Sequence, residues 1–316
     1  MHMSMAHSLR TLILLCALLP AIANAKEHLL WLIRDLPPFT IFEGSERGQG
    51  VIDRMLPLLI EQMPEYDHSI VRVNRARGLQ MLQESPFACD PTLLWTPERA
   101  KYARFSAPTF SALSSGVVVR KQASSSVEPF VADQQIDLKS LLAKGELKLG
   151  IVAQRSYSAQ VDDILRQLPD SALSRHYGNE ATANLLQMQQ LGRLQLVLGY
   201  WHEVRYLIQQ QGGNLADYAF YPIQGVDKYQ PFHVACSDTP LGREAISHID
   251  LLLPALRHDT LPGLYARWLE PAVRDRYLQN AREFADAQAN VASTPLSRQK
   301  ETPIAGEDDR GESKAF

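Results

Sequence analysis

One arginine of this chain stands where its side chain can bind a carboxylate. Residues 96–110 read TPERAKYARFSAPTF, and Thr96 can cap a helix whose first position is Pro97, with Glu98 in the first turn. Arg99 follows, and its planar guanidinium can hold a carboxylate through two parallel hydrogen bonds. An arginine in the first turn of a helix is more often a solvated side chain, so the spacing alone leaves both interpretations open.

Other motifs that could carry chemistry are incomplete. Gly48 and Gly50, followed by Asp53, resemble part of a dinucleotide-binding loop, but the third glycine is absent, which favours a simple turn before a helix. His202-Glu203 begins like a zinc-protease helix, yet Tyr206 stands where the second histidine is needed. The nine histidines are scattered rather than spaced as ligands. We therefore expect no metal, no cofactor and no catalytic residue.

The N-terminus has the pattern of a secretory signal peptide. After a positively charged start, an apolar run extends from Leu12 to Leu19, and Ala23-Asn24-Ala25 is a typical cleavage site, so residues 1–25 should be removed. Cys16 lies within the run, but Leu15 precedes it, where bacterial lipidation needs a small residue. A soluble protein of the periplasm is therefore predicted.

Length, charge and cysteine content narrow the function further. A mature chain of roughly 290 residues is long enough for two lobes of about a hundred residues each. The formal net charge is −3 and there is no basic stripe, so nucleic acid is not an expected partner. Cys89 and Cys236 remain in the mature chain. An even pair in an oxidising compartment suggests one disulfide, the alternative being two buried free thiols.

Hydrophobic patterning predicts two α/β units and a tail. In the first unit, strands at 28–33, 69–73 and 87–94 alternate with helices that follow Gly50 and Asn74, an order that favours a mostly parallel sheet with helices on both faces. The second unit has expected helices at 138–143, 158–168, 179–191 and 201–210 and strands at 147–152 and 194–198. Two further helices carry apolar positions within 246–256 and 261–269.

These patterns set the expected boundaries. We assign residues 26–117 and 232–289 to lobe 1 and residues 118–231 to lobe 2. The chain is expected to cross between the lobes at 118–123 and 228–234. Residues 290–316 are polar and poor in apolar side chains, which predicts a disordered tail.

The block around Arg99 resembles the T-x-E-R-x-x-x-x-x-F-S-x-P stretch of extracellular solute-binding protein family 3, the two-lobed periplasmic receptors of type II. The similarity covers roughly residues 27–280 and includes the RDLPPFTIF opening, the strand and loop at 147–158 and the helix at 265–269. It implies two α/β lobes, each a mostly parallel sheet flanked by helices, that close on a ligand. The opening and the block resemble a separate branch of the family, which implies the fold but no particular ligand.

The resemblance also implies a binding site. Arg99 matches the arginine that holds the ligand α-carboxylate, and Arg75 and Arg77 stand where the family commonly has an aromatic side chain. Three guanidinium groups in one cleft would favour an anionic ligand, because unpaired buried charges are costly, unless Arg75 and Arg77 point to water. The other ligand-facing positions expected in the first lobe are Asp35, Phe39, Thr92 and Leu94, and those in the second lobe are Ser156, Tyr157, Tyr200 and Trp201.

The second lobe departs from the pattern of amino-acid receptors. An aspartate that binds the ligand ammonium in those receptors is replaced here by Gly199-Tyr200-Trp201. A tyrosine can donate a hydrogen bond but cannot neutralise an ammonium group. This disfavours a free α-amino acid and favours a carboxylate joined to an aromatic, sugar or peptide part, although Tyr200 and Trp201 could equally be packing residues. The resemblance further implies that Cys89 and Cys236 lie on neighbouring strands of the first lobe.

Three functions follow from these observations. The first is a monomeric periplasmic solute-binding protein that captures a small carboxylate-bearing ligand for an ABC importer or a membrane sensor. The alternative is a periplasmic enzyme of the same fold, similar to cyclohexadienyl or arogenate dehydratases, with Asp35 and Glu203 as acid/base candidates. The third is a scaffold that does not close on a ligand.

Export gives the first testable prediction. The mature protein should begin at Lys26 and carry no lipid, because Ala25 ends the cleavage site and the residue before Cys16 is not small. Intact-mass spectrometry of the protein recovered from a periplasmic extract checks this. A lipid-modified N-terminal Cys16 would contradict it.

Overall fold

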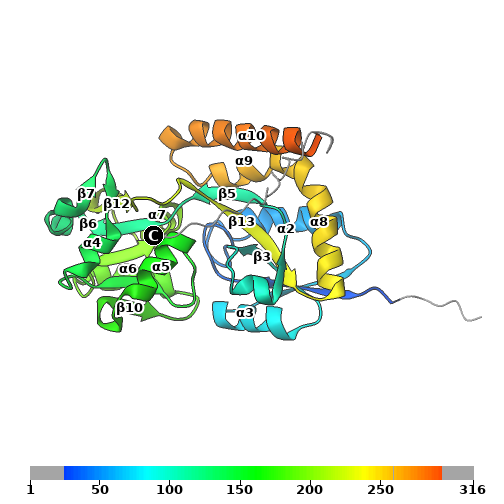
Figure 1. Ribbon diagram of the computed structural model, residues 1–316, viewed down its shortest axis with the longest axis horizontal. Coiled ribbons are helices and arrows are strands. Elements are labelled where there is room, and N and C mark those ends of the chain that lie inside the picture. The colour runs from blue at the N-terminus through cyan, green and yellow to red at the C-terminus, as the bar shows by residue number, and fades with distance from the viewer. Residues whose placement is uncertain (1–24, 259, 294–316) are drawn as a thin grey trace, which may run out of the picture.

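The computed structural model describes residues 25–258 and 260–293, which form two α/β lobes side by side (Figure 1). The right-hand lobe in Figure 1 is built from both ends of the described chain, and the left-hand lobe from its middle. Residues 1–24 of the predicted signal peptide and residues 294–316 of the predicted tail lie outside the described residues.

The first lobe alternates strands and helices up to its first crossing. Its elements are β1 (His28–Ile33), α2 (Val51–Glu61), β2 (Asp67–Arg72), α3 (Arg75–Glu84), β3 (Ala88–Leu93), the 3-10 turn η1 (Arg99–Lys101), β4 (Ala103–Phe105) and β5 (Phe110–Leu113). After the second lobe the chain returns with β13 (Tyr229–Ser237), α8 (Pro240–His258), α9 (Thr260–Ala266) and α10 (Pro271–Ser293). In Figure 1, α10 lies along the upper edge of this lobe, beside α9.

The sheet of the first lobe has the strand order β2-β1-β3-β13-β4, and β5 also pairs with β13. β1 is parallel to both β2 and β3, because α2 and α3 return the chain to the same end of the sheet. β13 runs antiparallel to β3, β4 and β5. The sheet is therefore mixed, with its parallel strands at one side.

The second lobe repeats this plan. Its elements are β6 (Gly116–Arg120), η2 (Lys121–Ser126), η3 (Glu128–Phe130), β7 (Val131–Ala132), β8 (Gln135–Ile136), α4 (Leu138–Ala143), β9 (Leu149–Val152), α5 (Ala159–Gln167), η4 (Asp170–Ala172), β10 (Leu173–His176), α6 (Ala181–Gln190), β11 (Leu196–Gly199), α7 (Trp201–Gln210), η5 (Leu215–Asp217) and β12 (Tyr218–Pro222). The strand order β10-β9-β11-β6-β12 again places three parallel strands beside antiparallel ones.

Two short segments join the lobes. The first consists of Ser114 and Ser115, between β5 and β6, and the second is residues 223–228, between β12 and β13. The Ser114 backbone N–H donates to the Lys228 carbonyl at 3.0 Å, which ties the two segments together. β6 lies entirely in the second sheet, so the first crossing comes a few residues before the segment 118–123 expected from the sequence.

Local capping chemistry explains where most helices begin. Side chains of Asn74, Asp137 and Ser158 accept hydrogen bonds from the first turns of α3, α4 and α5, and the sequence predicts the first two of these caps. α6 differs from the prediction, because its N-cap is Glu180 rather than Asn179 and makes no side-chain cap bond.

Two helical predictions near the site and the C-terminus need correction. The helix expected from Pro97 is only a single 3-10 turn, although Thr96 Oγ1 still accepts from the Arg99 backbone N–H at 3.2 Å. α10 follows α9 and extends to Ser293, so residues 290–293 are helical and not part of a tail. Its sequence, rich in charged and polar residues, gave no strong apolar period.

The glycine-rich segment before α2 has a structural role. A Cβ at Gly50 would lie 2.3 Å from the Phe39 carbonyl oxygen, so only glycine allows this close approach. Asp53 accepts hydrogen bonds from the backbone N–H groups of Gly50 and Ile41 at 3.0 and 2.9 Å. The segment is thus a turn that begins a helix, as the sequence indicates.

The two lobes share a continuous apolar core, and a disulfide lies within it. Cys89 of β3 and Cys236 of β13 are paired residues of neighbouring antiparallel strands and form a disulfide. The predicted pairing is confirmed.

Removal of this disulfide should destabilise the protein. The bridge joins residues 147 positions apart, and a loop of that size corresponds to about 4–5 kcal/mol in the chain-entropy model. The Cys89→Ser/Cys236→Ser variant should therefore have a lower urea midpoint than the oxidised protein. Mature protein that is denatured without reductant should contain no titratable thiol. Two titratable thiols, or equal midpoints, would show that the bridge does not form in solution.

Candidate functional site

Four arginines lie at strand ends that face the space between the lobes. Arg34 directly follows β1, Arg75 begins α3 after β2, and Arg99 begins η1 after β3. Because β1, β2 and β3 are parallel, their carboxyl ends share one edge of the sheet, which is where open α/β sheets bind ligands. Arg155 comes from the corresponding edge of the second sheet, just after β9.

Arg34 is neutralised within the first lobe. Its Nη1 donates to Asp90 Oδ2, and its Nη2 donates to the Thr92 carbonyl oxygen at 3.0 Å. Asp90 Oδ1 accepts from the Thr92 backbone N–H at 2.9 Å. Both charged side chains are buried. The pair holds Arg34 in place and adds no net charge to the space between the lobes.

Arg155 is neutralised within the second lobe. Its Nη1 and Nη2 donate to the two carboxylate oxygens of Glu203 at 3.0 and 2.7 Å. Burial lowers the pKa of Arg155, but Glu203 raises it by more, so the net pKa is raised and the guanidinium remains charged. The Thr182 hydroxyl donates to Glu203 Oε1 at 2.8 Å. Glu203 is therefore fully occupied and is not a free acid or base.

Arg99 is buried and has only carbonyl partners. Its Nη1 donates to the Leu94 carbonyl at 2.9 Å, and its Nη2 reaches the Gln154 carbonyl of the second lobe at 3.5 Å. No carboxylate within residues 25–258 and 260–293 forms an ion pair with it. Burial and the neighbouring cation Arg34 lower the pKa of Arg99. Its charge is thus oriented but not neutralised.

Arg75 has neither a hydrogen bond nor an ion pair to any described residue. Its Nε is buried and unpartnered. Burial lowers the pKa of Arg75 well below its ordinary value, and the charges of Arg34, Arg155 and Arg99 lower it further. A guanidinium held among three others without an anion is destabilising, and a bound anion would remove that cost.

These four guanidinium groups line one cavity of about 20 Å³ between the lobes, which we call the arginine cavity. Its other walls are Leu36, Thr92, Leu93, Leu94, Ser156, Tyr200 and Phe232. Thr92 Oγ1 and Arg34 Nε are buried there and hydrogen-bond to no described residue. Buried polar groups without partners are uncommon in folded proteins, so the cavity lacks polar atoms that a ligand can supply.

Six of the residues that the sequence predicts for the site line this cavity, and five do not. The six are Arg75, Arg99, Thr92, Leu94, Ser156 and Tyr200. The five are Arg77, Asp35, Phe39, Tyr157 and Trp201. Tyr200 is fully buried, and its Oη donates to Gln230 Oε1 at 2.7 Å.

Arg77 and Trp201 point away for identifiable reasons. Two positions along an α-helix correspond to a rotation of about 200°, so Arg77 faces solvent where Arg75 faces the cavity, and its Nη1 donates to Gln80 at 3.2 Å. The Trp201 ring stacks on Phe220 with 5.5 Å between centroids, and its Nε1 donates to Glu270 at 3.4 Å. Trp201 is therefore a packing residue of the second lobe.

Phe39 lies behind the cavity wall in an aromatic cluster. It packs edge to face against Phe232 at 5.1 Å and stacks on His202 of the second lobe at 5.1 Å. His202 Nδ1 lies 2.9 Å from the hydroxyl of Tyr265, which belongs to the first lobe. Burial lowers the pKa of His202 to about 3, so the imidazole is neutral. This cluster joins the two lobes without charge.

Tyr157 and Asp35 have other surroundings. The Tyr157 hydroxyl accepts from the Val152 backbone N–H at 2.9 Å, which fixes the loop that carries Arg155. Asp35 is half-buried beside the cleft, and burial raises its pKa to about 6, with the negative charges of Glu43 and Glu180 adding to the shift. It does not line the arginine cavity.

Sequence reasoning missed Arg34, Arg155 and their carboxylate partners as members of the site. A signal was present, because each arginine comes within three residues of the end of an apolar strand. Their partners Asp90 and Glu203 lie 56 and 48 positions away along the chain, so the pairing depends on the tertiary structure.

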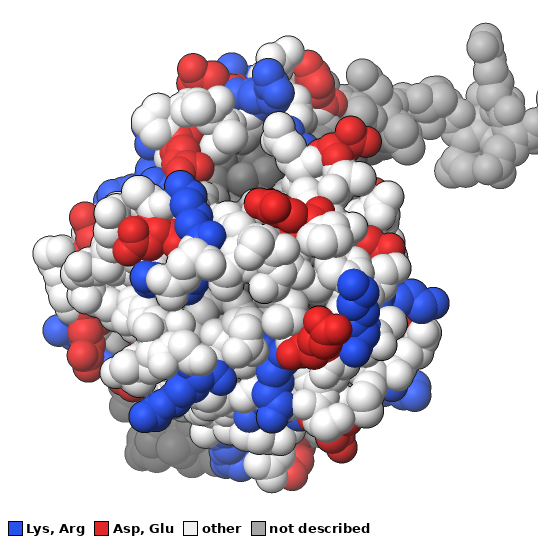
Figure 2. All heavy atoms as spheres, turned by 90° about the vertical axis from the view of Figure 1, so that its left-hand side faces the viewer, with Lys and Arg blue, Asp and Glu red and all other residues white. Residues whose placement is uncertain are grey.

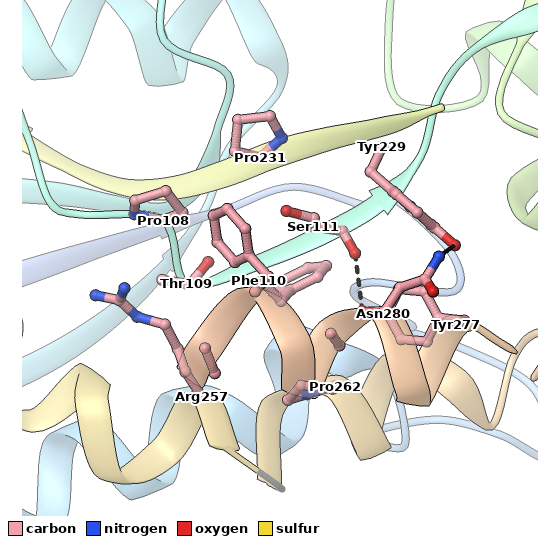
Figure 3. A pocket seen from close by; sticks show the side chains of 13 residues that line it. Pro108, Thr109, Phe110, Ser111, Tyr229, Pro231, Arg257, Pro262, Tyr277 and Asn280 are labelled. Carbon is pink, nitrogen blue, oxygen red and sulfur yellow. Dashed lines mark hydrogen bonds between the residues drawn. The ribbon is translucent and has the colours of Figure 1, made fainter. Parts of the chain in front are cut away.

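A larger cavity, of about 430 Å³, lies outside the cleft, between β5, β13 and α10 (Figure 3). Its walls are mainly apolar, and polar groups in it already bond one another: Tyr277 Oη donates to the Ser111 carbonyl, and Asn280 Nδ2 donates to Tyr229 Oη. We place the candidate site in the smaller arginine cavity, because unpaired charge identifies a ligand site more specifically than volume does.

The surface, the metal-binding side chains and the helices add three observations. On the end face of the second lobe, Lys and Arg are interspersed with Asp and Glu, and neither sign forms a continuous stripe (Figure 2). Within the described part of the chain, no group of three or more His, Cys, Asp or Glu side chains could hold a metal ion. None of the described helices is long and apolar enough to cross a membrane.

Comparisons with solved structures identify the fold. A histidine kinase sensor domain with similarity to periplasmic binding proteins aligns with 77% of this chain and 96% of its own, at 14% identity and a TM-score of 0.59. A structure from work on glutathione import via GshT and the cystine ABC importer of Streptococcus mutans aligns with 77% of this chain and 95% of its own, at 14% identity and a TM-score of 0.60. An arginine-specific periplasmic binding protein of Salmonella typhimurium aligns with 77% of this chain and 100% of its own, at 16% identity and a TM-score of 0.57.

No family model matches the chain, and no curated protein matches it. The similar structures share 14–16% of their residues with it, so they show the fold alone. That fold is the two-lobed α/β fold of type II periplasmic binding proteins, seen in solute-binding proteins and in a kinase sensor domain. The predicted fold class is confirmed.

Asp35 gives a prediction of pH-dependent stability. Its pKa is about 6 in the folded protein against 3.8 ordinarily, so between these values the folded state binds more protons than the unfolded chain. The ionised carboxylate therefore destabilises the fold above pH 6, and this cost disappears as the pH falls towards 4. Asp35→Asn should raise the free energy of unfolding at about pH 8, on the order of 1 kcal/mol for a half-buried group, but not at about pH 4. Urea unfolding at both pH values checks this, and an equal effect at both would contradict it.

Proposed function

We propose that the chain is a periplasmic solute-binding protein whose lobes close on a small ligand that carries a carboxylate or an equivalent anionic group. The observation that carries the proposal is Arg75, a guanidinium without a partner that lines the arginine cavity beside three others. An anion bound there would supply the missing counter-charge, and Arg99 is oriented beside it. In this proposal Arg75 and Arg99 hold the anionic group, while Arg34 and Arg155 shape its surroundings.

The architecture supports closure around such a ligand. Three of the arginines come from the first lobe and Arg155 from the second, so a ligand in the cavity touches both lobes at once. The two joining segments, 114–115 and 223–228, are short and lie together, which allows hinge motion about one side of the cleft. A ligand that contacts both lobes stabilises the closed arrangement over the open one.

Export and a membrane partner belong to the same proposal. The signal-peptide pattern at residues 1–25 and the disulfide Cys89–Cys236 fit an oxidising compartment. The structurally similar proteins include ABC-importer receptors and a kinase sensor domain, so the closed form of this protein would be recognised by a permease or a sensor. A dehydratase is less well supported, because Glu203 is bound to Arg155 and Asp35 does not line the cavity.

A thermal-shift screen tests the binding function directly. Carboxylates, amino acids, short peptides and cell-wall fragments should be compared, because a ligand that binds the folded state raises the melting temperature in proportion to its affinity and concentration. Small-angle scattering of the protein with the best compound should report a more compact particle. A protein that binds none of them and keeps its dimensions would fit the scaffold alternative.

Arg75→Gln should have opposite effects on binding and on stability. Loss of a half-buried guanidinium that becomes buried when it pairs with a ligand anion should weaken binding by roughly 2–5 kcal/mol, or about thirtyfold to several thousandfold. The same change should raise the melting temperature of the empty protein, since it removes an uncompensated charge next to three cations. Calorimetry on the compound selected by the screen, together with thermal unfolding, measures both.

Arg77→Gln is the matched control, because Arg77 lies on the same helix but faces solvent. It should change neither affinity nor stability appreciably. If Arg75→Gln instead lowers the stability of the empty protein and leaves affinity intact, Arg75 is a structural residue and the site assignment fails.

A further inference from the structure

The arginine cavity is surrounded by more positive than negative charges, and the excess can be counted. Four guanidinium groups line the cavity, and two carboxylates, Asp90 and Glu203, pair with two of them. Arg75 and Arg99 have no carboxylate partner among residues 25–258 and 260–293. The cavity therefore has two positive charges without counter-charges in the described protein.

The nearby carboxylates are already saturated. Asp90 binds Arg34 and the Thr92 backbone, and Glu203 binds Arg155 and the Thr182 hydroxyl. Asp162, near the opening of the cleft, accepts from the Ser156 hydroxyl and the Tyr157 backbone N–H. None of these groups forms an ion pair with Arg75 or Arg99.

The cavity also lacks a group that could accept an ammonium ion. Its lining contains no aspartate or glutamate. The Tyr200 hydroxyl is already bonded to Gln230 and offers no formal negative charge. A ligand ammonium placed in this cavity would face the two uncompensated guanidinium groups of Arg75 and Arg99 at short range, which is unfavourable.

We infer that the natural ligand is a small dianion without an ammonium group. This inference rests on the proposed binding function and specifies its ligand. The two negative charges compensate Arg75 and Arg99, and the apolar side chains of Leu36 and Phe232 contact the uncharged part. Dicarboxylates, which carry the charges on two groups, and phosphate monoesters or phosphonates, which carry both on one group, share this chemistry.

Matched pairs of compounds test the inference at about pH 8. Isothermal calorimetry should compare dicarboxylates from malonate to adipate with their monomethyl esters, glutarate with L-glutamate, and methyl phosphate with dimethyl phosphate. Each pair differs by one negative charge or by one ammonium group. At least one dianion should bind tenfold or more tightly than its monoanionic ester, and glutarate should bind more tightly than L-glutamate. Tighter binding by dicarboxylates or by methyl phosphate distinguishes the two sources of charge.

Variants locate the effect in the cavity. In Arg75→Gln, the preference for a dianion over its monoester should fall by tenfold or more, because one of the two unpaired cations is gone. In Arg77→Gln the preference should be unchanged. If Arg75→Gln keeps the full preference, the dianion binds elsewhere and the inference is overturned.

The outcomes separate this inference from the proposed function. Monoanions or L-glutamate binding as tightly as the matched dianions would overturn the dianion assignment and leave the binding function intact. The dianion assignment is also overturned, and the binding function left intact, if no dianion binds while another compound of the thermal-shift screen binds to the protein but not to Arg75→Gln. Failure of all compounds in both experiments would count against the proposed function itself.

Discussion

The uncompensated positive charge of Arg75 and Arg99 is the constraint around which the space between the lobes is arranged. Four guanidinium groups meet at one cavity, and each follows a strand of its lobe by one to six residues. Two of these arginines are neutralised by buried carboxylates of their own lobe. Asp90 pairs with Arg34 in the first lobe, and Glu203 pairs with Arg155 in the second. Such pairs gain little net stability, since desolvation offsets their attraction, but they fix the orientation of the groups that remain.

Apolar and hydrogen-bonded contacts between the two lobes oppose the repulsion among the arginines. Phe39 and Tyr265 of the first lobe contact the neutral His202 of the second, and Tyr200 bonds to Gln230 beside the return crossing. The depressed pKa of His202 follows from its burial and from the charge of Arg155, and it keeps this contact uncharged. Hydrophobic burial and hydrogen bonds on the hinge side thus oppose electrostatic repulsion at the ligand side.

Much of the fold could be predicted from local sequence, and the composition of the site only in part. Apolar runs and capping residues such as Asn74 and Asp137 identify strands and helices, because those signals are local. The resemblance around Arg99 led to the two-lobed fold, and the positions of Cys89 and Cys236 led to the disulfide. The ion pairs of Arg34 and Arg155 could not be predicted, since their partners lie on other elements brought close only by folding. Arg77 was predicted beside Arg75, but the helix directs the two side chains to different faces. Which of the two faces the cleft depends on the orientation of the helix, and the sequence does not define that orientation closely enough.

The same balance of forces explains how a ligand can select one arrangement of the lobes. In the proposed function, closure of the lobes buries Arg75 and brings Arg155 near it, so the desolvation of Arg75 and the repulsion from Arg155 are costs of the closed arrangement. A neutral ligand that filled the cavity would leave these costs in place. An anion that reaches Arg75 and Arg99 removes them in the closed state alone, and a ligand shifts an equilibrium only by its differential affinity for the two states. The unpaired charges therefore make closure dependent on the charge of the ligand, whereas the aromatic contacts at Phe39 and His202 favour closure whatever the cavity contains.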